Sequence, residues 1–323
     1  MIHKPVLTNE VLKALDPKPG EFMIDATLGG GGHALEIINK IGDQGTLLAV
    51  DLDKNAIEAF ESRAKNLKIR VVVVNDNFVN LPKILESEGL GRADGLLMDL
   101  GLSSDEIEAS SRGFTFKKDE PLLMTLDDSQ TPVKEIIRAL NEEELANVIY
   151  ELGDERYSRH IAKEIKETLR KGERIDTTFA LRDAIYRAVP RNYEKGRIDP
   201  STRTFLALRI YANHELENLK AVFRNLNSIL KPGGRLVVIT FHSGEDRIVK
   251  NIFRDMAKIG EVTLINKKAI APQRDEILEN PRSRSAKLRA LVWQRGSGAS
   301  TEKFRLVGVK NLEAAMMNFR KRT

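Results

Sequence analysis

Residues 25–33 read DATLGGGGH, and this stretch decides the expected fold of the chain. The apolar run at 22–24 predicts a buried strand just before it. The four glycines then let the backbone turn sharply and approach a ligand with no Cβ in the way. Apolar side chains at Leu35, Ile37 and Ile38 predict a helix after the turn. This strand–turn–helix unit is typical of a doubly wound α/β sheet.

Asp51 follows the next predicted strand, at 46–50, and is expected at its carboxyl end. A carboxylate in that position can accept two hydrogen bonds from a ribose diol. The glycines are contiguous rather than spaced as G-x-G-x-x-G, and no basic residue lies among them. The pattern therefore favours a ligand without phosphate, such as S-adenosylmethionine (SAM). A glycine-rich surface turn with a helix-capping Asp is the alternative explanation.

Composition narrows the class of protein. The chain has 323 residues, a net charge of +5 and no cysteine, which excludes disulfides and thiolate metal sites. Its five histidines are scattered without metal-ligand spacing, so no metal site is expected. There is no signal-like segment and no apolar run of membrane length, which predicts a soluble, cytoplasmic protein.

The order of the predicted elements indicates one sheet with an interruption. The β-branched run at 71–74 is typical of a parallel strand buried on both faces, and another strand is expected at 96–98. Helical periodicity then continues from about 131 to 230, before strands return at 235–240, 261–265 and 287–293. We therefore expect a Rossmann-like α/β sheet with an all-helical insertion after strand four. The predicted limits are 1–104 and 211–323 for the sheet domain and 105–210 for the insertion.

Capping signals place several helix ends within the insertion. Thr131 is expected as an N-cap with Pro at the first helical position. Asn141 and Glu144 resemble a capping box, and Gly153 and Gly172 occupy expected C-cap positions. An apolar stripe recurs every four residues through Tyr157, Ile161, Ile165 and Leu169.

Polar or aromatic residues follow each of the five parallel strands, where this fold binds ligands. Phe78 could cover an adenine ring, although such a residue is more often part of a core. Asp99 is the most suggestive: a carboxylate that accepts from an exocyclic amine localises the nitrogen lone pair for attack on a methyl donor. Capping of the following loop is the alternative for Asp99. We expect His242 to be a structural polar group rather than a base.

Two basic segments are compatible with a nucleic-acid partner. Arg191, Arg197 and Arg203 lie in the stretch 182–209, where cations outnumber acids, and a second run spans 282–289. Clustered cations suit phosphates, whereas a solvated helix face is the ordinary explanation.

Several ordered segments resemble the bacterial MraW/RsmH family over nearly the whole chain. The matching segments are HKPVL (3–7), DATLGGGGH (25–33), LMDLGLSS (97–104), RGFTF (112–116), STRTF (201–205), FHSGEDRIVK (241–250) and NPRSRS (280–285). The resemblance implies a SAM-dependent methyltransferase that acts on the N4 amine of a decoding-centre cytidine in 16S rRNA. Its partner would be 16S rRNA or the small ribosomal subunit, with the helical insertion helping to hold RNA. The implied SAM contacts are Gly31, Gly32, His33, Asp51, Phe78, Asp99 and Glu106, the last replacing the family's usual Gln.

One segment departs from the family pattern. Residues 120–127 read EPLLMTLD where the family usually has GPLDMRMD, so an acid and an Arg are lost. This departure motivates the alternative of a catalytically weakened RNA-binding relative that acts in ribosome assembly. A nucleotide-dependent oxidoreductase is a third reading, which the missing G-x-G-x-x-G disfavours.

Overall fold

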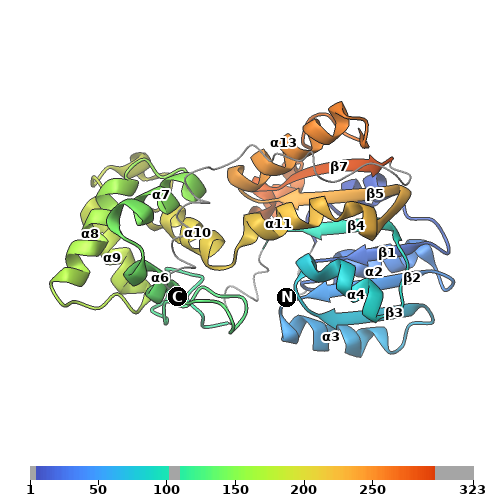
Figure 1. Ribbon diagram of the computed structural model, residues 1–323, viewed down its shortest axis with the longest axis horizontal. Coiled ribbons are helices and arrows are strands. Elements are labelled where there is room, and N and C mark those ends of the chain that lie inside the picture. Colours follow the sequence, from blue (N-terminus) through green and yellow to red (C-terminus); the bar gives the residue numbers. More distant parts are fainter. Residues whose placement is uncertain (1–4, 102–109, 295–323) are drawn as a thin grey trace. The chain divides into compact units, whose positions relative to one another are not determined.

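The computed structural model describes residues 5–101 and 110–294 (Figure 1). The chain divides into two compact units. The first contains the described residues of Met1–Ser103 and of Leu216–Leu306, and the second contains those of Ser104–Glu215.

The first unit is built on a seven-stranded sheet with the order β3-β2-β1-β4-β5-β7-β6. Strands β1 to β5 run parallel, and β7 is antiparallel to both of its neighbours. This arrangement confirms the predicted Rossmann-like α/β sheet. The strands are β1 (Phe22–Asp25), β2 (Thr46–Asp51), β3 (Arg70–Asn75), β4 (Ala93–Asp99), β5 (Leu230–Thr240), β6 (Val262–Leu264) and β7 (Lys287–Trp293).

Helices cover both faces of this sheet, because alternate residues of each strand point to opposite sides. Met23 and Leu47 belong to one apolar core, and Ile24 and Leu48 to the other. The first core is covered by α1 (Thr8–Leu15), α2 (Gly32–Ile41) and α3 (Lys54–Ala64). The second is covered by α4 (Leu81–Ser87), α11 (Glu215–Arg224), α12 (Leu226–Ile229) and α13 (Ser243–Lys258).

Strand β3 differs from the expectation of burial on both faces. It lies at the edge of the sheet, and its residues 71–74 are only half-buried. An edge strand has a neighbour on one side only, so less of its surface is covered. The β-branched run therefore predicted the strand correctly and its position in the sheet wrongly.

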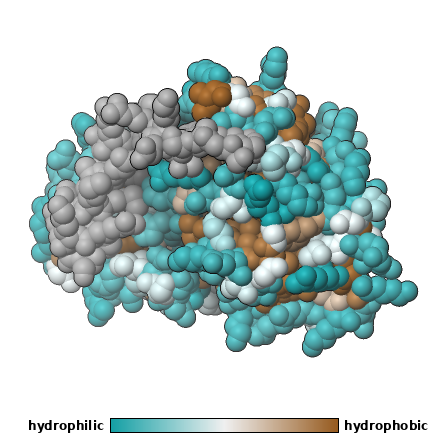
Figure 2. Space-filling view, turned by 45° about the vertical axis from the view of Figure 1, so that its right-hand side comes forward, coloured by the Kyte–Doolittle hydropathy of each residue, from teal (hydrophilic) through white to brown (hydrophobic). Residues whose placement is uncertain are grey.

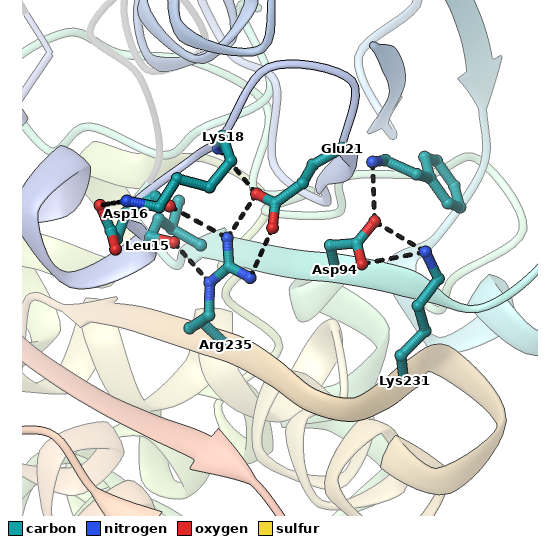
Figure 3. A network of polar contacts seen from close by, with 8 residues as sticks. Leu15, Asp16, Lys18, Glu21, Asp94, Lys231 and Arg235 are labelled. Atoms are coloured by element: carbon teal, nitrogen blue, oxygen red, sulfur yellow. Dashed lines mark hydrogen bonds and ion pairs between the residues drawn. The ribbon is translucent and has the colours of Figure 1, made fainter.

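Ion pairs tie together the amino-terminal ends of the central strands (Figure 3). The Arg235 guanidinium makes a two-pronged contact with Glu21, with nitrogen–oxygen distances of 2.6 and 2.9 Å, and also donates to the carbonyl of Leu15. Nearby, Asp94 accepts from Lys231 Nζ and from the backbone N–H of Phe22. These contacts fix the sheet at the end opposite to the residues that follow the strands.

The second unit is helical, with α6 (Val133–Ala139), α7 (Glu142–Gly153), α8 (Ser158–Arg170), α9 (Thr178–Ala188) and α10 (Ser201–Ala212). The predicted capping box of Asn141 and Glu144 is confirmed, with both reciprocal hydrogen bonds present. In the predicted stripe of α8, Ile161 and Ile165 are buried, whereas Tyr157 and Leu169 are half-buried.

Three other predicted helix ends had mixed outcomes. Gly172 adopts a left-handed conformation just after α8, as expected of a C-terminal glycine. Gly153 is instead the last residue of α7, and Asp154 takes the left-handed position. A Cβ at Gly153 would lie 2.5 Å from the Arg203 carbonyl, so close packing explains that glycine. The predicted cap at Thr131 is wrong, because Pro132 is still extended and α6 begins one residue later.

No helix within residues 5–101 and 110–294 combines the length and apolar character needed to cross a membrane. The face of the molecule in Figure 2 is a mosaic of hydrophilic residues and separate apolar patches. Such a mixture is ordinary for a water-exposed surface.

Candidate active site

The carboxyl ends of β1 and β4 bring two carboxylates together. Asp25 ends β1 with a fully buried side chain, and its Oδ1 accepts from the backbone N–H of Thr27 at 3.2 Å. The Thr27 hydroxyl oxygen in turn accepts from the backbone N–H of Asp99 at 2.6 Å, which fixes the end of β4 against the end of β1. The neighbouring parallel strands therefore place Asp25 and Asp99 at the same edge of the sheet.

His33 joins these carboxylates from the first turn of α2. Its Nε2 lies 3.6 Å from Asp99 Oδ2, and the imidazole is buried. Three side-chain atoms here, Asp25 Oδ2, His33 Nε2 and Asp99 Oδ1, are buried without a hydrogen-bond partner among the described residues. Each such atom costs roughly 1–3 kcal/mol, so buried polar atoms are normally paired. Their concentration at one place is the signature of a site that receives polar groups of a ligand.

Burial and charge perturb this cluster. Burial raises the pKa of Asp25 from 3.8 to about 7, partly offset by the nearby His33. Burial by itself lowers the pKa of His33, but the nearby carboxylates of Asp99 and Asp25 outweigh it and raise the pKa above its usual value of 6.5. The imidazole is therefore stabilised in its charged form between the two acids. Perturbed titratable groups of this kind are concentrated at functional sites.

Asp51 is held at the carboxyl end of β2 by backbone donors. Its Oδ2 accepts from the N–H of Gly29 at 2.7 Å, and its Oδ1 accepts from the N–H of Asp53 at 2.9 Å. Burial raises the pKa of the Asp51 carboxyl. Each carboxylate oxygen keeps a second lone pair, so Asp51 can accept two further hydrogen bonds. Gly29 itself has a left-handed backbone, with no atom within 4 Å of the place where a Cβ would stand.

The predicted ligand-binding glycines, Gly31 and Gly32, lie at the start of α2, where the protein itself requires glycine. A Cβ at Gly31 would lie 2.4 Å from the ring of Phe60, and one at Gly32 would lie 2.9 Å from Pro5. Gly31 also has a left-handed backbone that favours glycine. Close internal packing therefore accounts for these two glycines, whereas the open side of the turn is at Gly29.

The ends of β3 and β5 have clear structural roles. Asn75 donates from its amide to the carbonyls of Asp51 and Leu52, at 2.9 Å each, and so ties the ends of β2 and β3 together. Phe78 is half-buried and packs on the apolar core. His242 is the N-cap of α13: its Nδ1 accepts from the N–H of Glu245. Its Nε2 lies 3.1 Å from Glu245 Oε1, and the structural role expected for His242 stays a prediction.

Sequence reasoning missed two members of this site, and one residue that it predicted lies outside the described part of the chain. Asp25 and Thr27 were quoted as part of a motif but not assigned to the site. The available signal was an acid that ends an otherwise apolar strand, FMID. The predicted cofactor contact Glu106 lies outside the described residues.

The predicted RNA-contacting cations are not equivalent. Arg191 and Arg197 are exposed, and no ion pair to another described residue involves them. Arg203 is instead half-buried and pairs with Glu194 at 3.0 Å. In the second basic run, Arg289 is buried and donates to Asp246 at 2.7 Å. Arg203 and Arg289 therefore have structural partners that the charge pattern did not reveal.

The segment that departs from the family pattern is well integrated into the helical unit. The buried Glu120 accepts from the backbone N–H of Gly113 at 3.1 Å. Arg112 donates to the carbonyl and hydroxyl of Thr125, at 2.6 and 2.8 Å, and to Asp128. The replaced residues thus have local partners.

Comparison with known proteins identifies the family. The model of the MraW methylase family matches residues 1–293. The chain belongs to the MraW methylase family. This finding confirms the resemblance drawn from the motifs.

Three curated relatives carry the name ribosomal RNA small subunit methyltransferase H. The protein from Syntrophotalea carbinolica is 40% identical over 305 residues, covering 90% of this chain and 97% of its own length. The protein from Clostridioides difficile is 39% identical and covers 89% and 97%, respectively. The protein from Ehrlichia chaffeensis is 42% identical and covers 90% and 99%.

Proposed function

We propose that this protein uses SAM to methylate the N4 amine of a decoding-centre cytidine in small-subunit (16S) rRNA, in the cytoplasm. Membership of the MraW methylase family and the names of the relatives support the reaction class and the RNA substrate. The observation that carries the proposal is the buried cluster of Asp25, His33 and Asp99, in which three polar atoms have no hydrogen-bond partner within residues 5–101 and 110–294.

The residues at this edge of the sheet fit the cofactor. When bound, SAM supplies an electrophilic methyl group on a sulfonium. Asp25 Oδ2 and Asp99 Oδ1 are buried acceptors without a partner in the described part of the chain, which suits a ligand that carries an ammonium and a sulfonium charge. Asp51 has lone pairs left to accept from a ribose diol. We assign the Phe78 ring, which is half-buried, to contact with the adenine. We assign Gly31, Gly32 and His33 to the turn that lines this site.

Asp99 is the proposed catalytic residue. Its free Oδ1 would accept a hydrogen bond from the exocyclic amine of cytosine. That bond would draw the lone pair away from the ring and onto nitrogen. It would also stabilise the positive charge that develops as nitrogen bonds to the methyl carbon while the methyl–sulfur bond breaks and sulfur leaves as a neutral thioether. The same oxygen can then receive the proton that the amine loses.

His33 is a positioning residue for Asp99. Its Nε2 lies 3.6 Å from Asp99 Oδ2, so a protonated imidazole would place a positive charge beside the carboxylate and hold it in position. The backbone N–H of Asp99 is anchored by Thr27 at the same time. Both contacts hold the carboxylate before substrate binds, which is how preorganised charges lower a barrier.

We assign RNA binding to the helical unit, the predicted insertion at 105–210. Arg191 and Arg197 are exposed cations that can contact phosphates. Arg203 pairs with Glu194 at 3.0 Å, so its proposed part in RNA binding is to hold the turn that lies between Arg191 and Arg197.

The decisive experiment is mass spectrometry of nucleosides from small-subunit rRNA of cells with and without this protein. We expect N4-methylated cytidine at one site, lost on deletion and restored by the parental gene. A deletion strain with unchanged rRNA would refute the proposed function. Failure of the Asp99→Asn gene to restore the mark, in cells where the protein is folded, would separate an enzyme from an RNA-binding relative without catalysis.

The RNA-binding assignment has its own test in the salt dependence of affinity. Each phosphate contact adds roughly 0.7–0.9 to the slope of log affinity against log salt. The double variant Arg191→Ala, Arg197→Ala should therefore lower the slope by about 1.5. The matched control Lys83→Ala, Arg92→Ala removes two exposed cations of the sheet unit and should leave the slope unchanged. Equal slopes for both double variants would contradict the assignment.

A further inference from the structure

One surface of the helical unit combines aromatic rings with arginine. Helix α9 (Figure 1) carries Phe179, Arg182 and Tyr186, spaced three and four residues apart, so their side chains share one face. The guanidinium carbon of Arg182 lies 3.8 Å from the centre of the Phe179 ring, and Arg182 also pairs with Asp183. Tyr186 follows one turn later and is 45% exposed. One face of α9 therefore carries an exposed ring next to a stacked guanidinium.

The Tyr186 ring is held in place despite its exposure. Its hydroxyl donates to Asp199 Oδ2 at 2.7 Å. Asp199 is itself fixed, because its Oδ1 accepts from the backbone N–H of Ser201 at the start of α10 at 2.8 Å. Because its hydroxyl is anchored, the exposed ring has little conformational freedom left to lose on binding. Such preorganisation favours contact with a partner.

Exposed cations lie next to this ring along the chain. Arg191, Lys195 and Arg197 are exposed, and within the described part of the chain none of them has an ion-pair partner. Arg197 is two residues from Asp199, the residue that holds the Tyr186 hydroxyl. The loop that carries the cations therefore adjoins the aromatic face of α9.

This loop is strained and locked at its base. Glu194 and Lys195 have left-handed backbones, with φ of 45° and 53°, although neither is glycine. The buried Tyr193 donates its hydroxyl to the buried Glu155, and Glu194 pairs with Arg203. Strained backbones persist only where surrounding contacts impose them, and they concentrate at functional sites. These contacts hold Lys195 at the exposed tip of the turn.

We infer that the α9 face and the loop 191–197 form a binding surface for unpaired RNA. Tyr186 and the Arg182–Phe179 pair stack on bases, and Arg191, Lys195 and Arg197 hold the adjoining phosphates. Only unpaired RNA presents base faces to aromatic rings, whereas a duplex offers chiefly phosphates and sugars. The inference rests on the proposed function, because it takes rRNA as the substrate, and it adds that the bound segment is single-stranded.

The test compares binding of two labelled RNAs by fluorescence anisotropy: an unstructured strand of about 12 nucleotides, within the usual range of site sizes, and a duplex of the same length. Tyr186→Ala should weaken binding of the single strand roughly tenfold or more, because each stacked base contributes strongly to affinity. The salt slope should stay at its parental value, since no charge is removed. Duplex affinity should hardly change.

Matched variants separate stacking from other effects. Tyr150 on α7 is another exposed tyrosine of the same unit, 60% exposed, and Tyr150→Ala should bind both RNAs as the parent does. Tyr186→Phe keeps the ring and should retain most of the affinity. Arg182→Lys keeps the charge but loses the planar group, so it should weaken single-strand binding with an unchanged salt slope. Far-UV circular dichroism reports whether the helical unit of each variant is folded.

Two outcomes would overturn the inference: Tyr186→Ala matching Tyr150→Ala, or an equal loss for single strand and duplex. Binding of an acidic peptide that depends on Tyr186, without any effect on RNA, would assign the surface to a protein partner instead. These failures are distinct from failure of the proposed function. If cells show the rRNA methylation but Tyr186→Ala binds RNA normally, only the stacking surface is refuted. If the rRNA methylation is absent from cells that contain the protein, the proposed function is refuted.

Discussion

Asp25 links the buried cluster to the stability of the sheet unit, and replacing it by Asn gives a sharp prediction. Its carboxyl is fully buried, and no described residue forms a hydrogen bond with Oδ2. Its pKa is raised from 3.8, the value expected when the chain is unfolded, to about 7 in the folded protein. The folded state therefore binds a proton more tightly than the unfolded state.

The sign and size of the effect follow from this difference. A raised pKa stabilises the folded protein below about pH 4, and that contribution is lost as pH rises through about 7. Each pKa unit corresponds to about 1.36 kcal/mol, so the full loss is about 4 kcal/mol. Asn does not titrate. We therefore compare the free energy of unfolding of the parent with that of Asp25→Asn at each pH. The difference, parent minus variant, should fall by up to about 4 kcal/mol between pH 4 and 7.5.

Trp293 provides the assay. It is the only tryptophan in the chain, and it is buried in the core of the sheet unit that contains Asp25. Its fluorescence during urea unfolding thus reports that unit, even if the two units unfold separately. Asp43→Asn, which removes an exposed carboxylate of the same unit, is the matched control and should follow the parent. If the free energies of unfolding of the parent and of Asp25→Asn change with pH in the same way across this range, the reasoning is refuted.

Three further predictions concern the site and the opposite end of the sheet. Asp99→Asn should slow methyl transfer by roughly a hundredfold or more while SAM affinity changes less; calorimetry that shows equal losses would make Asp99 only a cofactor ligand. Asp51→Ala should weaken SAM binding at least about tenfold, since charge-assisted hydrogen bonds contribute about 1.5–3 kcal/mol each; unchanged affinity in the folded variant would remove Asp51 from the site. Arg235→Met should destabilise the sheet unit by about 2–3 kcal/mol, because the half-buried Glu21 loses its cationic partner and keeps the Lys18 backbone N–H as a donor. Lys18→Ala, which breaks an exposed pair, is the control and should hardly change urea unfolding.

The strands and their ligand-facing ends could be predicted because their signals are local. Short apolar runs marked β1, β2 and β4, and an acid follows or ends each of them. The capping box of α7 was equally readable, since its two hydrogen bonds join residues three apart. In a parallel sheet the carboxyl ends of strands share one edge, so the residues at these ends were expected to meet without knowledge of any contact.

Contacts between distant residues could not be read in this way. The charge pattern grouped Arg203 with Arg191 and Arg197, yet only Arg203 folds against Glu194. The run that contains Arg289 suggested RNA, but β7 brings that side chain to Asp246 on α13. The β-branched run of β3 gave no sign of its place at the sheet edge.

The amino-acid sequence alone determined the α/β class, the glycine turn, the helical segment between β4 and β5, and the resemblance to the MraW methylase family. The tertiary structure decided that Asp25, His33 and Asp99 form one buried cluster, and that Phe60 and Pro5 impose glycine at 31 and 32. The physical reason is the separation along the chain of the residues that interact. Periodicity and caps depend on neighbours along the chain, whereas burial of a charge, a clash with a Cβ and an ion pair depend on which distant segment packs against it.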